Sequence, residues 1–142
     1  MIAEAIALAT EVHGKQFDKQ GAPYILHPLR VMFAVRDAGH PEPHQVVAVL
    51  HDALEDAETE SDRIRVRVRI GELFNPRIGL AIIAMTHDRN VPYMEYIKDV
   101  KNDPIAAIVK RFDIEDNMDP KRFFHKVNYK KYAKALGFLL GQ

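Results

Sequence analysis

The polar and apolar positions along the chain predict a series of helices separated by short loops. The first of them, over residues 2–16, consists mainly of Ala, Glu, Leu and Ile, of which all but Ile are strong helix formers. The segment 17–28 contains Gly21, Pro23 and Pro28, which favour a loop. Further helices are predicted over residues 29–37, 43–53, 75–85, 91–101, 104–117 and 121–140.

One segment fits two structures. Residues 64–70 alternate perfectly between Ile or Val and Arg, which is the pattern of a half-buried strand. No second strand is predicted elsewhere in the chain, and an isolated strand is unstable. We therefore predict a helix here. The whole chain, residues 1–142, is then expected to be a single all-α domain, a helical bundle.

Composition limits the class of protein. A chain of 142 residues is long enough for one domain with a sizeable core. Lys plus Arg equals Asp plus Glu, 20 of each, which argues against a general nucleic-acid binder. No cysteine is present, so a metal would have to use His and carboxylate ligands. Without a membrane-spanning run or a signal peptide, a soluble cytoplasmic protein is expected, and its oligomeric state stays open.

The candidate chemistry begins at the end of the apolar run 46–50, where His51 and Asp52 follow directly. Glu55 and Asp56 come four positions later, and residues four apart share one face of a helix. Three acids and an imidazole in an apolar setting would be unstable unless a cation lay between them. This cluster therefore predicts a metal site.

Two other segments supply candidate ligands. His27 precedes Pro28, which restricts the preceding residue to an extended backbone and would fix the position of the histidine. Asp113 lies in the predicted helix 104–117 with Asn117 on the same face, and Asp116 is expected to point elsewhere. Two histidines and two carboxylates suit Mn²⁺, Fe²⁺ or Zn²⁺ better than Mg²⁺ or Ca²⁺. The candidate ligand set is His27, His51, Asp52 and Asp113.

Each of these residues also has an interpretation without a metal. A single His-Asp pair is more often a surface feature, and the acids 55–56, 113 and 116 could form solvated helix faces. His27 could cap a helix. We expect His13 to be a core histidine and the two lysines Lys19 and Lys110 to be solvated. Four further histidines are expected at the surface: His40, His44, His87 and His125.

Taken in order, four motifs change this balance. They are His13-Gly-Lys-Gln16, the block Gly-Ala-Pro-Tyr-Ile-Leu-His-Pro-Leu at 21–29, Leu-His-Asp-x-x-Glu-Asp at 50–56, and Lys110-x-x-Asp113-x-x-x-Asn117. In this order they resemble the HD-domain phosphohydrolases, and most closely the (p)ppGpp, or alarmone, hydrolase domain of RelA/SpoT-type proteins. The resemblance covers residues 3 to 117 and extends more loosely to the C-terminal helix.

The resemblance implies an all-helical domain with one divalent metal, typically Mn²⁺, held by the four candidate ligands. It implies that Glu55 and Asp56 activate water and transfer protons, and that Asn117 contacts the substrate. Lys19 is a candidate to neutralise a further phosphate. The implied reaction removes the 3′-pyrophosphate from guanosine tetra- or pentaphosphate. Some small relatives have been linked to other phosphorylated nucleotides, including NADPH.

The chain departs from this pattern near the expected substrate. Asp18 stands beside Lys19 where longer relatives usually carry an arginine, and an acid there is expected to repel a guanosine polyphosphate. Three functions therefore stay open. They are a phosphohydrolase with (p)ppGpp as leading substrate, a hydrolase for NADPH or a nucleoside monophosphate, and a non-catalytic domain that binds a nucleotide or a partner protein.

Overall fold

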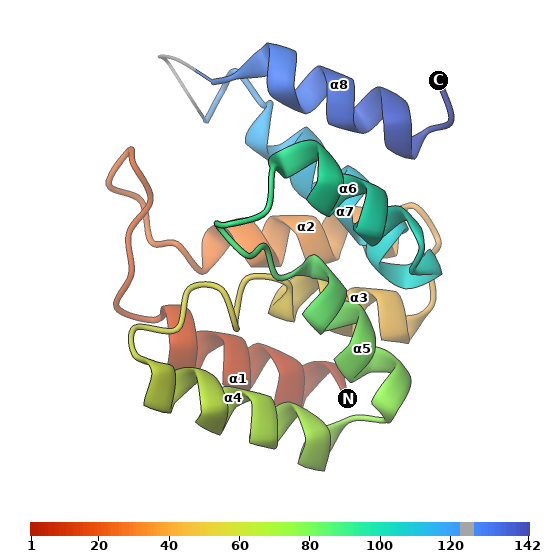
Figure 1. Cartoon of the computed structure of the whole chain (residues 1–142). Coiled ribbons are helices and arrows are strands. Elements are labelled where there is room, and N and C mark those ends of the chain that lie inside the picture. The colour runs from red at the N-terminus through yellow and green to blue at the C-terminus, as the bar shows by residue number, and fades with distance from the viewer. Residues whose placement is uncertain (123–126) are drawn as a thin grey trace.

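The computed structural model describes residues 1–122 and 127–142, and within these ranges the chain is helical with no strand. These described ranges contain eight helices: α1 (Ile2–His13), α2 (Leu26–Asp37), α3 (Glu42–Leu50), α4 (Glu60–Leu73), α5 (Pro76–Met85), α6 (Tyr93–Lys101), α7 (Pro104–Asn117) and α8 (Tyr129–Leu139). Figure 1 shows α8 beside α6 and α7, at the opposite end of the bundle from α1 and α4. The all-α prediction is confirmed.

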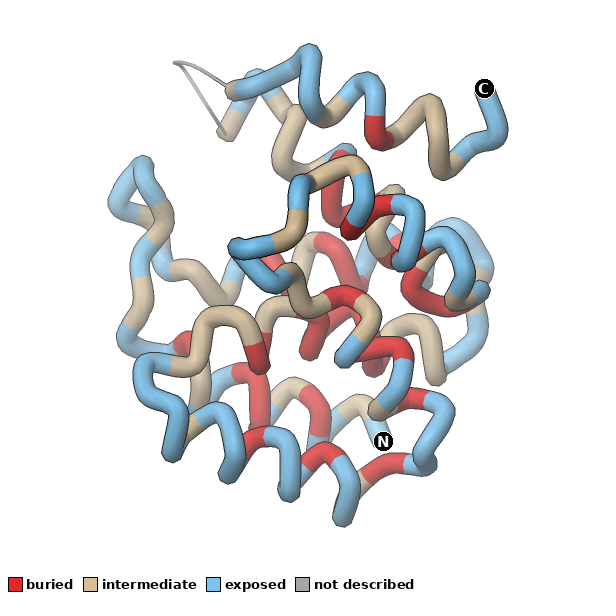
Figure 2. Tube along the Cα trace, in the orientation of Figure 1, coloured by how far each residue is buried: buried red, intermediate tan, exposed pale blue. Residues whose placement is uncertain are grey.

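Helix α3 lies at the centre of the bundle. Its run of five apolar residues, 46–50, is completely buried, because α1, α2, α5 and α7 all pack against it. A helix that is apolar all round is stable in water only when it is covered on every side. Figure 2 shows this buried centre, with exposed residues concentrated on the outer helices. The buried apolar side chains of the described residues form one hydrophobic cluster.

The alternating segment 64–70 is helical, as predicted. It forms the middle of α4, where Val66 and Ile70 lie four residues apart and are both buried. Ile64 and Val68 are exposed, so the alternation does not describe two faces of a strand. The helix begins at a cap, in which the side chain of Thr59 accepts a hydrogen bond from the backbone N–H of Asp62.

Four predicted helix boundaries were wrong by three or more residues. Helix α1 ends at His13 rather than at 16. Helix α2 begins at Leu26 rather than at 29, so His27 is helical and not extended, with Pro28 tolerated in the first turn. Helix α3 ends at Leu50, and residues 51–56 form consecutive turns. In the predicted helix 121–140, residues 121 and 122 form a turn, and α8 begins at Tyr129 after a cap provided by Asn128. The prediction for His125 lies outside the described residues.

Within residues 1–122 and 127–142, no helix has the length and apolarity needed to cross a membrane. The cytoplasmic location inferred from the sequence stays a prediction.

Candidate metal centre and adjoining cleft

Three of the four predicted ligands converge at the centre of the bundle. His27 comes from the first turn of α2, His51 from the residue after α3, and Asp113 from α7. One donor atom from each lies within 4.8 Å of the other two, and all three side chains are buried. The Oδ1 atom of Asp113 lies 3.0 Å from Nε2 of His27 and 3.2 Å from Nε2 of His51.

Asp52 completes the cluster. Its Oδ2 atom lies 3.0 Å from Nε2 of His51 and 3.6 Å from Nε2 of His27. The same oxygen accepts a hydrogen bond of 2.5 Å from the hydroxyl of Tyr24, a residue of the Pro-Tyr-Ile motif. The structure therefore brings all four predicted ligands together.

Both histidines present Nε2 to the centre of this cluster. Nδ1 of His51 lies 2.7 Å from the carbonyl oxygen of Ala48, which can only accept, so Nδ1 carries the proton. Nδ1 of His27 lies 2.6 Å from Oδ2 of Asp116 and donates in the same way. A fixed outer acceptor on Nδ1, which leaves Nε2 free to bind an ion, is the arrangement found around metal-ligating histidines.

The electrostatics of the cluster fit a cation. Nε2 of His51 is buried and has no hydrogen-bond partner among the described residues, although two carboxylates surround it. Burial alone would lower the pKa of His51, but Asp52 and Asp113 hold it well above its usual value. The cluster thus requires positive charge at its centre, which either protons or a divalent ion can supply. The N and O donors match the ions expected from the sequence.

The prediction that Asp116 points away from the site was wrong. Its carboxylate supports the metal cluster through His27. Besides His27, its carboxylate accepts hydrogen bonds from Nε of Arg30 at 2.9 Å and from Nη1 of Arg122 at 2.6 Å. The prediction overlooked that residues three apart on a helix are neighbours, so Asp116 shares a face with Asp113. That face of α7 packs against α2.

Lys110 was predicted to be solvated, and this was wrong, because its side chain is part of the site. It lies one turn before Asp113 on α7, and its Nζ atom is 2.8 Å from Oδ2 of that residue. One turn after Asp113, the amide of Asn117 donates to Oδ1 at 3.1 Å. The spacing in the Lys-x-x-Asp-x-x-x-Asn motif could have predicted these contacts, because residues three and four apart are neighbours on a helix.

Glu55 and Asp56 follow the metal cluster in the turns after α3. Oε1 of Glu55 accepts a hydrogen bond of 2.8 Å from the backbone N–H of His87, and burial raises the pKa of Glu55. Burial and the nearby charges of Asp52 and Glu55 raise the pKa of Asp56 to about 7. Both acids are therefore able to hold a proton at higher pH than an exposed carboxylate.

A cleft of two adjoining cavities leads to the cluster. The inner cavity, of about 190 Å³, is lined by Glu55 and by the ligands Asp52 and Asp113. The outer cavity, of about 390 Å³, is lined by residues that include Lys19. The two cavities share four wall residues: Tyr24, Asn117, Lys131 and Tyr132.

Asp18 lies at the outer cavity but has a structural role. Its Oδ1 atom accepts hydrogen bonds from the backbone N–H groups of Gln20 and Ala22, at 2.8 and 3.0 Å. Its Oδ2 atom lies 3.8 Å from Nη2 of Arg122. The carboxylate therefore stabilises the turn of its own loop and is balanced by an arginine, which weakens the expectation that it repels a polyphosphate.

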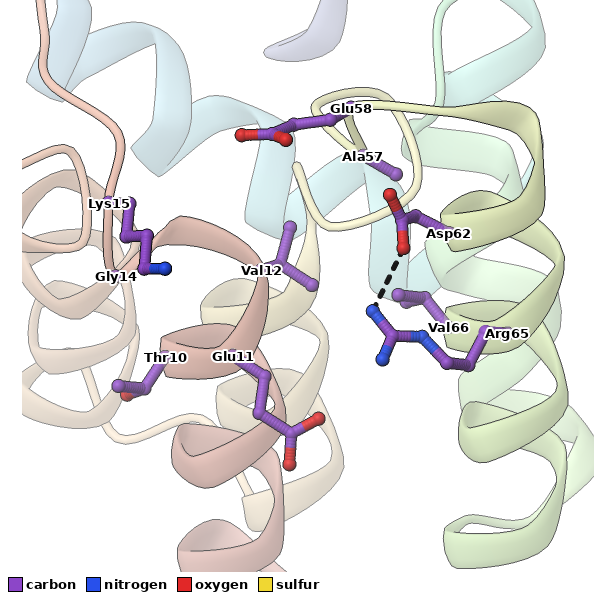
Figure 3. Close-up of a pocket in the computed structure, with 10 residues that line it drawn as sticks. All are labelled: Thr10, Glu11, Val12, Gly14, Lys15, Ala57, Glu58, Asp62, Arg65 and Val66. Carbon is purple, nitrogen blue, oxygen red and sulfur yellow. Dashed lines mark hydrogen bonds and ion pairs between the residues drawn. The ribbon is translucent and has the colours of Figure 1, made fainter.

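A further cavity, of about 490 Å³, lies between α1 and α4. Figure 3 shows its charged rim, where Asp62 and Arg65 form an ion pair of 3.0 Å. It shares no lining residue with the inner or outer cavity. We assign it no part in the chemistry of the cluster.

The chain is similar in sequence to known proteins. No protein-family model matches the chain. It is 32% identical over 135 residues to a guanosine-3′,5′-bis(diphosphate) 3′-pyrophosphohydrolase of Aquifex aeolicus, over 94% of this chain and 19% of that protein. It is 33% identical over 86 residues to a GTP pyrophosphokinase rsh of Brucella ovis, over 61% and 11% of the two chains. The chain is an HD-domain relative of RelA/SpoT-type alarmone hydrolases.

The fold of this alarmone-hydrolase relative is found in a solved structure too. That structure, described as a metazoan ortholog of SpoT that hydrolyzes ppGpp, matches with a TM-score of 0.74 at 21% identity. The match covers 98% of this chain and 84% of the other. This chain spans about a fifth of the length of the Aquifex protein, which is far longer.

Of the other histidines, His40 and His44 were predicted at the surface but are half-buried and stack on each other, with ring centres 5.5 Å apart. Two more lie in the core and at the cleft. His13 is buried, as predicted, with Nδ1 2.7 Å from Oε1 of Gln16. His87, predicted at the surface, is half-buried, stacks on Tyr96 at 4.4 Å and lines the inner cavity. No spacing in the sequence connects His87 with the ligands, because its position depends on the packing of α5 and α6.

Proposed function

We propose that the chain is a metal-dependent phosphohydrolase that releases pyrophosphate from the 3′ position of guanosine 3′,5′-bis(diphosphate). The observation that carries this proposal is the convergence of two Nε2 atoms and two carboxylates, with both Nδ1 atoms held by outer acceptors. The substrate is proposed from the printed names of the relatives.

The proposed ligands are His27, His51, Asp52 and Asp113, and the proposed ion is Mn²⁺, with Fe²⁺ or Zn²⁺ as alternatives. A bound ion of this kind lowers the pKa of a water molecule and offsets the charge of phosphate oxygens. Tyr24 orients Asp52 through its hydroxyl, and Asn117 orients Asp113 through its amide.

Glu55 and Asp56 are the proposed acid–base pair. Water attacks the phosphorus next to the ribose 3′ oxygen, and the bond between that phosphorus and the 3′ oxygen breaks. The proton of the attacking water passes to Glu55 or Asp56, and the 3′ oxygen takes up a proton as it leaves. A pKa near neutrality allows a carboxylate to act in both directions, and burial shifts both acids that way.

The outer cavity is the proposed site for the nucleoside. Lys19 lines it and can neutralise a phosphate, whereas Asn117 lies at the passage to the inner cavity and can contact the substrate from α7. With the nucleoside there, its 3′ phosphate would reach the metal cluster past Tyr24 and Tyr132.

The test is release of pyrophosphate and orthophosphate in Mn²⁺ from ppGpp, NADPH and several nucleoside monophosphates. Pyrophosphate from ppGpp, lost in His51→Ala and Asp52→Ala but kept in the control His44→Ala, would support the proposal. Orthophosphate from NADPH or a monophosphate, with ppGpp intact, would assign the site to another substrate. Nucleotide binding without turnover in any divalent ion would make it a non-catalytic domain.

A further inference from the structure

Tyr93, which lines the inner cavity, has a buried hydroxyl group without a partner among the described residues. Oη of Tyr93, at the start of α6, is buried and accepts or donates no hydrogen bond among the described residues. A buried polar group without a partner is unfavourable, and such groups are rare in folded proteins. Burial raises the pKa of Tyr93 to about 12, so the hydroxyl keeps its proton and can donate it to a ligand oxygen.

A lysine from the C-terminal helix lies beside this tyrosine. Nζ of Lys131 is 4.3 Å from the centre of the Tyr93 ring and 5.1 Å from that of Tyr132. It forms no ion pair with any carboxylate in the described part of the chain. Burial lowers the pKa of Lys131, as do the charges of Lys110 and Lys19, whereas the charge of Glu55 raises it. The Nζ atom of Lys110 also lies near the tyrosine, 6.0 Å from the centre of the Tyr93 ring. An anion between these groups would be favourable.

The position of Tyr93 relative to the metal cluster indicates which kind of anion would bind between these groups. Lys131 lies on the wall that the inner and outer cavities share, whereas Tyr93 lines the inner cavity together with Asp52 and Asp113. For a nucleotide that enters through the outer cavity, a second phosphate attached to the reacting one would extend into this inner cavity. The carboxylate of Glu55 also lines it, but Oε1 of that residue accepts from the amide of His87.

We propose that Tyr93 and Lys131 form an anion subsite for the terminal phosphate of a diphosphate group whose first phosphate lies at the metal cluster. Tyr93 would donate its hydroxyl hydrogen bond to a terminal phosphate oxygen, and Lys131 would supply charge. This inference rests on the proposed function, and it explains how the site would select a pyrophosphate ester over a phosphate monoester. Both residues lie outside the motifs that resemble the alarmone hydrolases.

The test measures binding of inorganic pyrophosphate and orthophosphate to the Mn²⁺-loaded protein by titration calorimetry. The variants are Tyr93→Phe and Lys131→Gln. The controls are Tyr129→Phe and Lys130→Gln, which make the same changes at exposed residues at the start of α8, the helix that carries Lys131. We expect the wild type to bind pyrophosphate at least about tenfold more tightly than orthophosphate. That ratio should fall several-fold in each variant and stay unchanged in the controls.

A wild-type protein that binds both anions equally, or variants that keep the wild-type ratio, would overturn the subsite. Lys131 is an exposed residue, so its variant keeps the test valid even if Tyr93→Phe unfolds the protein. The binding ratio requires no turnover. If the wild type turns over ppGpp but the two variants keep its ratio of pyrophosphate to orthophosphate affinity, the subsite alone is refuted. If that ratio falls in the variants but the wild type does not turn over ppGpp, the proposed function alone is refuted.

Discussion

The contact between Asp116 and His27 gives the sharpest prediction about the metal cluster. The carboxylate of Asp116 holds Nδ1 of His27 at 2.6 Å and is itself held by Arg30 and Arg122. Asp116→Asn keeps the shape of the side chain but removes the charge that makes Nε2 of His27 a better donor. Loss of such an outer partner typically weakens metal binding by about 10- to 100-fold, or about 1.4 to 2.7 kcal/mol.

The assay is titration of the metal-free protein with Mn²⁺, followed by calorimetry or by the electron paramagnetic resonance of free Mn²⁺. Glu115→Gln is the matched control, because it removes the same charge from the neighbouring, exposed position of α7. Affinity should fall in Asp116→Asn and change little in the control. Equal affinity in Asp116→Asn and wild type would refute the role of Asp116, and equal losses in both variants would indicate a general charge effect instead.

Three further predictions concern stability. Asp103 caps α7 and pairs with Arg77 at 2.7 Å, so Asp103→Ala should cost about 1–2 kcal/mol in urea unfolding at pH 7. Burial alone would raise the pKa of Asp103, but Arg77 and the capped N–H groups lower it. The stabilisation is therefore complete above the unfolded pKa of about 3.9 and should disappear as the pH falls through the lower folded value. Mn²⁺ at about 100 times its Kd should stabilise the wild type by about 2.7 kcal/mol, which would appear as a higher Tm. EDTA should reverse this increase, and Mn²⁺ should leave the Tm of the control variant His51→Ala unchanged. Leu50→Ala, at a fully buried position of α3, should cost about 2–5 kcal/mol in the same urea assay, and a loss below 1 kcal/mol would contradict the central position of that helix.

The sequence was sufficient for the elements whose stability depends on a repeated pattern. The run 46–50 predicts a buried central helix because five consecutive apolar residues need cover on all sides. Residues 64–70 were assigned correctly only because a lone strand would lack a partner. The boundary at Leu50 could not be predicted, since the turns 51–56 are stabilised by tertiary contacts such as that between Gln16 and the carbonyl of Asp56.

The same distinction separates the metal cluster from the residues that support it. The four candidate ligands could be identified from the sequence, because their residue types and their order form recognisable motifs. The residues that support His27 could not, because Asp116 lies 89 residues further along the chain, and Arg122, which donates to Asp116, lies six residues beyond it. Their contacts exist only because α7 packs against α2.

Asp18 shows how such contacts change an electrostatic argument. In the sequence it is an acid beside Lys19, at a position where an arginine is expected, and this predicts repulsion of a polyphosphate. In the structure its carboxylate accepts two backbone hydrogen bonds and faces Arg122. A carboxylate that accepts hydrogen bonds within its own loop and lies beside an arginine repels a polyphosphate in the cleft only weakly. Substrate selection is then better sought in Lys131 and Tyr132, which α8 brings to the passage between the two cavities. These residues follow the segment 3–117 that carries the motifs, so two chains with the same ligands can differ in the nucleotide they accept.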